Sequence, residues 1–396
     1  MSAGADRRFS IVCLSPQKWD APLPTNRQQI MRRAAAHGHE VLFVETGGFL
    51  GAHALRLARG PERRSLARRL VGSEPVTPGI TAVKAVNLAP WGRKLAAACG
   101  ANNALTSLRI GRLVAALPAP VVAWLYDPCA AGLAARLNVA FTVYDCVDDY
   151  AEQTRGDARR RALVTATDRQ AALLSRVVFA TSQPQQRRLA TLNPHTHLVR
   201  NVGDYDHFSP AADPSFAAEE LRGLPGPVVG FAGNMLPGKV DFPLLERLAR
   251  ARPQWTFLCV GPLPDASAVE ALRPLPNVRL LGARTYAELP RYVAAFDVGL
   301  IPYLHNDYTR SCFPLKLYEV LAAGKPVVAT GLPELAGMEP DVSLAATDAE
   351  TLDALERGLA ARGPEDVARR RQRASGNTWE TRTSTLLSLV ETELAS

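Results

Sequence analysis

The stretch from residue 296 to residue 330 constrains the fold most, because two apolar runs flank a helical pattern within it. The first run, residues 296–303, is mostly apolar with Pro302 next to its end, which is typical of a strand buried on both faces. After a polar loop, Pro314 favours the first turn of a helix and Gly324 favours its end. Residues 327–329 are the next buried strand. The order strand, loop, helix, strand predicts an α/β unit with parallel strands.

The loop before this helix is a predicted anion site. A helix N-terminus offers unpaired backbone N–H groups and partial positive charge, and here it lies at residues 311–315, just after Arg310. Lys316 follows in the first turn, where its charge opposes the helix dipole unless an anion is bound. Glu319 lies one turn further on, and its carboxylate can accept two hydrogen bonds from a ribose diol. We expect a phosphate site at the start of this helix; the alternative is an ordinary α/β helix with exposed charges.

The second half of this stretch resembles a known family. Glu319 and residues 321–328, LAAGKPVV, are similar to the nucleotide-sugar motif of GT-B retaining glycosyltransferases of family four. The resemblance is closest to the bacterial branch described as teichuronic-acid-type glycosyltransferases. The family motif carries two Glu residues, of which the first contacts the donor sugar and the second the ribose. The first position is Ser311 here, so the resemblance assigns only the ribose role, to Glu319.

The resemblance implies an α/β protein with the GT-B fold, two doubly wound Rossmann-like domains facing a cleft. The first domain, residues 1–205, would bind the acceptor, and the second, residues 206–376, would bind the nucleotide sugar. The last segment, residues 377–396, would form a helix that crosses back to the first domain. The resemblance covers nearly the whole second domain and is patchy in the first.

The same resemblance assigns the rest of the donor site. Gly233 ends the first strand of the second domain in a turn that lets backbone approach a ligand. Lys239 corresponds to the pyrophosphate lysine of the family, whereas the family's arginine is Asn234 here, so Arg310 or Lys316 is expected to supply that charge. Arg284 either stacks on the base or is an exposed arginine at a strand end. The predicted donor-binding residues are Gly233, Asn234, Lys239, Arg284, Arg310, Ser311, Cys312, Phe313, Pro314, Leu315, Lys316 and Glu319.

In the first domain, acidic residues follow predicted strands. Asp127 follows the strand at residues 121–126, and Asp145 follows the strand at residues 141–144. Ligands of open α/β sheets bind beyond the carboxyl ends of the strands. The predicted catalytic residues are Asp127 and Lys239, and the acceptor-side candidates are Trp19, Asn26 and Asp145.

The acids at residues 145–149 have a second interpretation. Asp145, Asp148 and Asp149 are spaced carboxylates of the kind that bind Mg²⁺ or Mn²⁺. A strand-end acid followed by a helix N-terminus that favours acids explains the same residues without a metal. The resemblance agrees, because GT-B enzymes generally need no metal. We therefore expect neither a metal nor another cofactor, with the nucleotide sugar acting as co-substrate.

The cysteines and the N-terminus indicate a cytoplasmic protein. The 6 cysteines show no paired spacing, so they are expected to be reduced core thiols. Arg7 and Arg8 precede only a short apolar run, unlike a signal peptide. No apolar run is long enough to span a bilayer.

The charge is divided unevenly along the chain. Residues 1–200 carry 27 Lys and Arg against 13 Asp and Glu, a net +14, whereas the remainder carries −6 of the total +8. The basic residues are densest at residues 51–70, where leucines alternate with Arg56, Arg59, Arg63, Arg64, Arg68 and Arg69. Such a segment is attracted to an anionic bilayer surface; the alternative is a solvated arginine-rich loop. The donor motif argues against nucleic acid as the partner.

These observations predict a glycosyltransferase that moves a sugar from a nucleotide-sugar donor to an acceptor hydroxyl, with retention by resemblance. The acceptor is expected to be a lipid-linked or cell-envelope glycan, reached by peripheral docking on the inner face of the membrane. The leaving diphosphate would take the acceptor proton, and cationic side chains would stabilise it. A nucleotide-sugar epimerase of the same fold and a non-catalytic nucleotide-sugar-binding protein are the alternatives.

Overall fold

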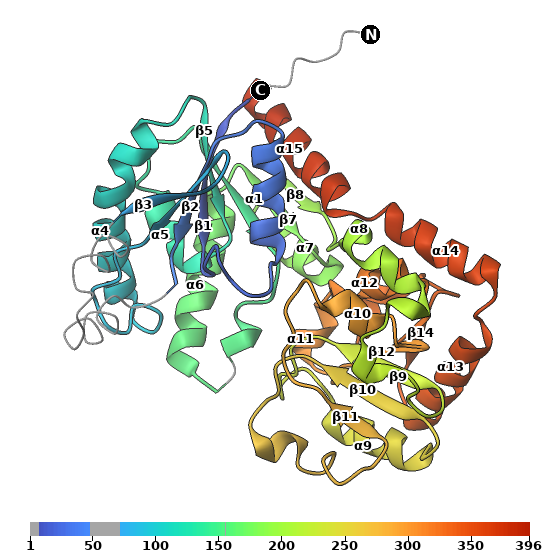
Figure 1. The fold of residues 1–396 in the computed structure, drawn as a ribbon. Helices are drawn as coiled ribbons and strands as arrows, with labels where there is room; N and C mark the ends of the chain where they lie inside the picture. The colour runs from blue at the N-terminus through green and yellow to red at the C-terminus, as the bar shows by residue number, and fades with distance from the viewer. Residues whose placement is uncertain (1–7, 48–71, 155) are drawn as a thin grey trace, which may run out of the picture. The chain divides into compact units, whose positions relative to one another are not determined.

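The computed structural model describes residues 8–47, 72–154 and 156–396, which form two compact units (Figure 1). The first unit comprises the chain up to Val199 together with Thr383–Ser396, and the second comprises Arg200–Arg382. This division falls a few residues before the domain boundary expected from the sequence. The arginine-rich segment at residues 51–70 lies outside the described residues. Within the described chain, no helix is long and apolar enough to cross a lipid bilayer.

The first unit contains an 8-stranded sheet in the order β3-β4-β2-β1-β5-β6-β7-β8. Neighbouring strands are parallel except for β3 and β4. The strand order reverses between β1 and β5, which is the switch point where ligands bind to sheets of this kind. The strands are β1 (Ser10–Ser15), β2 (Val41–Glu45), β3 (Ser73–Thr77), β4 (Ile80–Lys84), β5 (Val121–Leu125), β6 (Phe141–Cys146), β7 (Val177–Ala180) and β8 (Thr196–Leu198).

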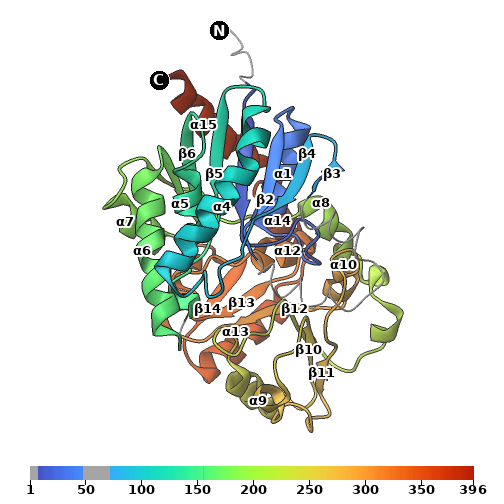
Figure 2. The same ribbon diagram turned by 90° about the vertical axis from the view of Figure 1, so that its left-hand side faces the viewer.

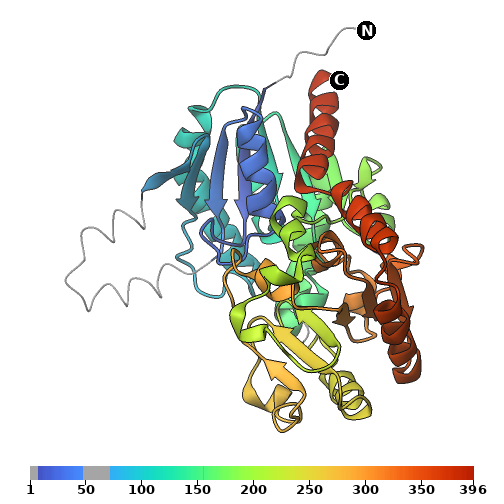
Figure 3. The same ribbon diagram turned by 45° about the vertical axis from the view of Figure 1, so that its right-hand side comes forward.

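Helices cover both faces of this sheet. Helix α1 lies on one face (Figure 3), and α4, α5 and α6 lie in the foreground when the opposite side faces the viewer (Figure 2). The last helix, α15 (Trp379–Ala395), belongs to the first unit from Thr383 onward, where Glu393 forms an ion pair with Arg176 at 2.7 Å. The other helices of this unit are α1 (Asn26–Ala36), α4 (Ala96–Ala115), α5 (Ala131–Ala134), α6 (Ala158–Leu174) and α7 (Gln183–Ala190).

The second unit contains a 6-stranded parallel sheet in the order β11-β10-β9-β12-β13-β14. The order reverses between β9 and β12, so the switch point of this sheet lies between those two strands. The strands are β9 (Val228–Ala232), β10 (Thr256–Val260), β11 (Val278–Leu280), β12 (Val298–Pro302), β13 (Val327–Thr330) and β14 (Val342–Ala345).

The helices around β12 differ in detail from the sequence expectation. The polar loop after β12 contains a one-turn helix, α11 (Asp307–Arg310), whose N-cap Asn306 accepts a hydrogen bond from Thr309 N–H at 3.0 Å. The next helix, α12 (Lys316–Ala322), begins at Lys316, after Pro314 rather than at it. The remaining helices are α8 (Tyr205–Phe208), α9 (Phe242–Ala251), α10 (Leu289–Val293), α13 (Asp348–Ala360) and α14 (Pro364–Ser375).

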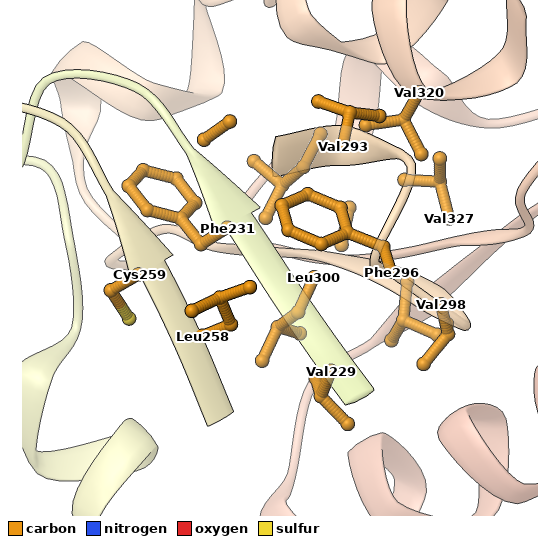
Figure 4. Packing of buried hydrophobic residues seen from close by; sticks show 14 of the residues in the cluster. Val229, Phe231, Leu258, Cys259, Val293, Phe296, Val298, Leu300, Val320 and Val327 are labelled. Carbon is orange, nitrogen blue, oxygen red and sulfur yellow. The ribbon is translucent and has the colours of Figure 1, made fainter. Parts of the chain in front are cut away.

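Two glycines let side chains pack closely on the switch-point strands. Gly230 of β9 and Gly299 of β12 are register partners in adjacent strands. A Cβ atom at Gly230 would lie 2.1 Å from the Phe296 ring, and one at Gly299 would lie 2.7 Å from Val320. Figure 4 shows Phe296 with Val293 and Val320 close by in the core of this unit. Val320 therefore packs α12 closely against β12, and Phe296 packs closely against β9.

Candidate functional site

The loops that leave β9 and β12 are tied together at the switch point of the second unit. Val240 and Tyr303 form an isolated antiparallel bridge. Leu304 N–H donates to the Lys239 carbonyl at 2.9 Å, and the Asn306 side chain donates to the Gly238 carbonyl at 3.1 Å. The segment that carries Lys239 is therefore held beside the segment that follows β12.

Gly233 gives the Lys316 side chain room at the end of β9. Its φ of +152° is in the region that favours glycine. A Cβ atom at this position would lie 2.5 Å from Lys316 Cε and 2.8 Å from Lys316 Nζ. The predicted glycine turn and the predicted helix-start lysine, although far apart in the sequence, are in direct contact.

The two lysines of the predicted site flank one aromatic ring. Lys316 Nζ donates to the Tyr303 hydroxyl at 2.6 Å and lies 5.1 Å from the centroids of both the Tyr303 and Phe231 rings. Lys239 Nζ lies 4.9 Å from the Tyr303 ring centroid and 5.2 Å from that of Tyr308. Among the described residues, no carboxylate lies within ion-pair distance of Lys316. Two cations held by aromatic faces at a switch point form a site that is complementary to a polyanion such as a diphosphate.

Glu319 lies in the first turn of α12, three residues after Lys316. The carboxylate is half-buried, and the described residues offer it no hydrogen-bond or ion-pair partner. The pKa of Glu319 is raised to about 7, and burial is the largest cause. The Lys316 cation lowers this pKa in part, and the Asp204 carboxylate raises it. An acceptor group without a donor, near the Lys316 cation, is compatible with the predicted ribose contact, which stays a prediction.

The segment at the start of the second unit forms a wall of this site that the sequence did not reveal. The Asn201 side chain donates to the Phe313 carbonyl at 2.7 Å, and the Arg200 guanidinium lies 5.5 Å from the Phe313 ring centroid. A Cβ atom at Gly203 would lie 2.7 Å from the Cβ of Tyr318. This segment therefore fixes the backbone on either side of the start of α12.

The predicted donor-site residues in the loop before α12 differ in their exposure and in their backbone hydrogen bonds. Arg310 is exposed and forms an ion pair with Asp307. Ser311 ends α11 and is half-buried. The Cys312 amide already donates to the Thr309 carbonyl at 3.0 Å, whereas the described residues offer no acceptor to the amide of Phe313 or Leu315. The loop thus presents backbone donors at Phe313 and Leu315 rather than at Cys312.

Asn234 and Arg284 take no part in the lysine cluster. Asn234 is exposed on the loop after β9. The Arg284 guanidinium donates to the Tyr292 hydroxyl at 2.5 Å and to the Leu281 carbonyl at 2.7 Å, and it pairs with Glu220 at 3.2 Å. These contacts hold Arg284 at the end of β11, so its proposed stacking on a base remains a prediction.

In the first unit, Asp127 lies at the end of β5, beside the switch point. It forms an ion pair with Arg93 and accepts hydrogen bonds from the Thr46 hydroxyl at 2.5 Å and from Cys129 N–H at 3.1 Å. Burial raises the pKa of the Asp127 carboxyl, but these donors outweigh burial and lower the pKa below its ordinary value. Asp127 is thus held ionised by its neighbours, and its catalytic role remains a prediction.

Asp127 and Arg93 lie in the wall of a cavity of about 540 Å³. Its lining is mostly apolar and includes Trp91, Cys99 and Leu133. Cavities of this size are typical of small-molecule sites, so this is where the first unit offers space for an acceptor.

The acceptor-side candidates lie outside this cavity. Trp19 is buried, and its backbone N–H donates to the Glu45 carboxylate at 3.0 Å. The Arg32 guanidinium lies 5.0 Å from the centroid of the Trp19 ring. Asn26 is buried at the first position of α1. Asp145 is fully buried in β6 and accepts a hydrogen bond from the Trp124 indole at 3.4 Å.

The acids at residues 145–149 are engaged with neighbouring backbone and side-chain donors. Asp148 accepts a hydrogen bond from Asp149 N–H at 3.0 Å, and Asp149 accepts one from Glu152 N–H, also at 3.0 Å. Within the described ranges, no group of three or more His, Cys, Asp or Glu side chains is placed to hold a metal ion. The six cysteines, all of which lie in described residues, are free and buried, as expected.

Known proteins resemble this chain in sequence and in fold. Residues 226–360 match the family model described as glycosyl transferases group 1. A protein of Bacillus subtilis strain 168 that is provisionally named teichuronic acid biosynthesis glycosyltransferase TuaH is 36% identical to this chain over 215 residues. That match covers 50% of this chain and 52% of the relative, so the chain spans about half the length of the curated relative it matches.

Solved structures share the fold over nearly the whole chain. Sucrose-phosphate synthase from Thermosynechococcus elongatus has a TM-score of 0.72 at 17% identity and covers 98% of this chain and 100% of its own. Anabaena HepE in complex with UDP-glucose has a TM-score of 0.66 at 17% identity, with the same coverage. WaaG, a lipopolysaccharide glycosyltransferase, has a TM-score of 0.63 at 15% identity, covering 96% and 99%. These likenesses confirm the expected GT-B fold.

Proposed function

We propose that the chain transfers a sugar from a nucleotide-sugar donor to an acceptor hydroxyl, because residues 226–360 match the model of group 1 glycosyl transferases and the chain shares the GT-B fold. One observation carries the proposal: Lys316 and Lys239 flank Tyr303 at the switch point of the second unit, with an unpartnered Glu319 one turn along α12. This arrangement supplies cations for a diphosphate and an acceptor for a ribose diol.

The proposed roles follow from the charges at each position. Glu319 accepts hydrogen bonds from the ribose hydroxyls, and Lys316 and Lys239 bind the diphosphate, with the amides of Phe313 and Leu315 as further donors. As the bond to the sugar breaks, negative charge grows on the diphosphate, and cations that are already in place stabilise it without reorganisation. The diphosphate then takes the proton of the acceptor hydroxyl. In this proposal the configuration at the anomeric carbon is retained and no metal is needed.

The acceptor is proposed to bind the first unit, at the cavity that Asp127 and Arg93 line. The curated relative is named for teichuronic acid synthesis and WaaG for lipopolysaccharide synthesis, which supports a cell-envelope glycan or a lipid-linked precursor as the acceptor. The excess of basic residues in residues 1–200 favours an anionic membrane surface as a partner on the cytoplasmic side.

Calorimetry with UDP and UDP-glucose tests the donor site, since HepE is described in complex with both. Lys316→Met is expected to weaken both ligands by about tenfold or more, because a charged hydrogen bond to phosphate contributes roughly 1.5–3 kcal/mol. Lys325→Met is the matched control, because Lys325 lies just beyond α12 with Nζ 3.4 Å from the Ala294 carbonyl, away from the lysine cluster. Failure of the parent protein to bind either ligand, or any other nucleoside diphosphate, would contradict the proposed donor site and favour a non-catalytic scaffold protein whose donor site has decayed.

A further inference from the structure

Helix α4 of the first unit exposes an apolar stripe. The residues of this helix that face solvent are Ala96, Ala97, Ala101, Leu105, Leu108, Arg112 and Ala115. From Ala97 onward, this stripe recurs every three or four residues, which places it along one side of the helix. Leu108 is 80% exposed, the largest fraction among the exposed large apolar side chains of the described chain. Figure 2 shows α4 in the foreground of the first unit, lying across the sheet.

The opposite side of α4 carries polar groups that are buried and satisfied. The Asn102 side chain exchanges two hydrogen bonds with the backbone of Ala89, at 2.8 and 3.1 Å. The Thr106 hydroxyl accepts a hydrogen bond from Val86 N–H at 2.9 Å. The buried side also holds Ile110 and Val114, which pack in the core of the first unit. Leu105 and Leu108 therefore do not anchor the helix to its own unit, and their exposure is typical of an interaction surface.

The segment that enters α4 continues the apolar stripe. Leu88 is 55% exposed, Trp91 is 67% exposed and Leu95 is 41% exposed. Trp91 also has a φ of +56°, which is uncommon for a large side chain. The other tryptophans, at positions 19, 124, 255 and 379, are all buried. Tryptophan is the residue that membrane-water interfaces favour, because its ring is apolar and its N–H is polar.

The charge around this stripe selects among possible partners. No acidic residue occurs from Pro75 to Tyr126, whereas this part of the sequence contains Lys84, Arg93, Lys94, Arg109 and Arg112. Of these, Arg112 is exposed on the stripe itself. An apolar surface with cations and no anions is complementary to a bilayer that contains anionic lipid.

We propose that the exposed side of α4, together with Leu88, Trp91 and Leu95, is the surface that contacts an anionic lipid bilayer. The cavity lined by Asp127 lies against α4, since Cys99, Asn102 and Thr106 contribute to its wall. Trp91 lies both on this surface and in the cavity wall, so a lipid-linked acceptor would reach the cavity past Trp91. This biological use rests on the proposed function, but the contact itself requires neither donor nor acceptor.

Co-sedimentation with vesicles of equal parts phosphatidylglycerol and phosphatidylcholine tests the surface on the full chain. The parent protein is expected to bind, and Leu105→Gln with Leu108→Gln is expected to weaken partitioning by about tenfold or more, because two apolar side chains no longer enter the interface. Leu173→Gln in α6 is the matched control, since Leu173 belongs to the same unit and is 55% exposed. This control should bind vesicles like the parent.

Trp91 provides a second measurement that does not depend on the leucine variants. Vesicles that contain brominated phosphatidylcholine should quench the fluorescence of the parent protein, and Trp91→Phe should remove most of this quenching while leaving sedimentation largely intact. UDP-glucose calorimetry on every variant separates the two proposals, because the donor residues lie in the second unit. A parent protein that binds vesicles but does not bind UDP-glucose would overturn the proposed function and would leave the proposed bilayer surface intact.

Three results would overturn the surface itself. The first is a parent protein that ignores anionic vesicles at low salt. The second is equal binding by the parent and the double leucine variant, which would transfer any membrane contact to another part of the chain, such as residues 51–70. The third is a parent dimer that the leucine variant converts to monomer in sedimentation velocity, without any vesicle binding, which would identify the stripe as an interface between copies of the chain.

Discussion

Replacing Glu319 with glutamine should stabilise the protein without ligand and weaken its binding of nucleotide. The carboxylate is half-buried and has no donor partner among the described residues, and burial raises its pKa from 4.5 to about 7. Ionised Glu319 therefore destabilises the folded state until a ribose diol supplies hydrogen bonds. Glu319→Gln removes the charge and keeps the shape.

The pKa shift sets the size of the stability effect. A rise in the pKa from 4.5 to about 7 corresponds to at most about 3.5 kcal/mol, since one pKa unit is about 1.4 kcal/mol. Solvent screens a half-buried group, so we expect roughly 1–2 kcal/mol. The folded state holds the proton more tightly than the unfolded state, so the destabilisation is absent below about pH 4.5 and complete above about pH 7. Glu319→Gln should raise Tm by several degrees above pH 7 and leave it unchanged in acid.

Binding should change in the opposite direction. Loss of a charged acceptor weakens UDP-glucose by about tenfold or more, at roughly 1.5–3 kcal/mol. The parent's affinity should fall as the pH drops below about 7, since Glu319 must lose its proton to accept from both hydroxyls. The variant should lack this dependence. Calorimetry with UDP-glucose measures the profile cleanly, because its diphosphate carries no group that titrates near neutrality.

Glu246→Gln is the control for charge removal, since Glu246 is a partly exposed glutamate of α9 in the same unit. Equal affinities of the parent and Glu319→Gln for UDP-glucose at about pH 8 would refute the ribose contact. A parent affinity that does not change with pH, or a Tm that glutamine fails to raise above pH 7, would refute the argument from burial.

Three further predictions concern the same site. Gly233→Ala should abolish UDP binding and lower Tm, because its Cβ would lie 2.5 Å from Lys316 Cε at a φ of +152°, whereas Gly238→Ala, with nothing within 4 Å, should change neither quantity. Ser311→Glu should not improve transfer from the native donor, because we expect that donor to be held without the family's first glutamate; a gain in kcat/KM would contradict this. Transfer should survive EDTA, and activity that disappears with chelator and returns with Mn²⁺ would reinstate Asp145, Asp148 and Asp149 as metal ligands.

Sequence patterns predicted the elements whose residues are buried on two sides. Residues 327–329 are a continuous apolar run, and they lie in β13, an interior strand of the second sheet. Strand β3 escaped prediction because its sequence, SEPVT, is almost wholly exposed at the sheet edge and has no alternating apolar pattern. Helix α11 escaped because one polar turn with an Asn cap has the composition of a loop.

The same limit applies to the candidate site. Lys316 and Glu319 were predictable, because a helix start with a lysine and a glutamate is a local pattern. Tyr303 was interpreted only as a strand end, although its ring lies between two lysines. The hydrogen bond from Asn201 to the Phe313 carbonyl joins residues 112 positions apart, and no local pattern in a single sequence encodes such a contact.

The contacts of residues 200–204 determine where the two domains of this protein can be separated and exchanged. The Asn201 side chain donates a hydrogen bond to the Phe313 carbonyl, Gly203 lies against Tyr318, and Asp204 raises the pKa of Glu319. A chimera that joins a foreign first domain to this second domain should therefore be spliced before Arg200. A splice at residue 205, where the sequence places the domain boundary, would replace one wall of the nucleotide site together with the acceptor domain. Recombination between related genes meets the same restriction, so these five residues should be inherited with the donor specificity.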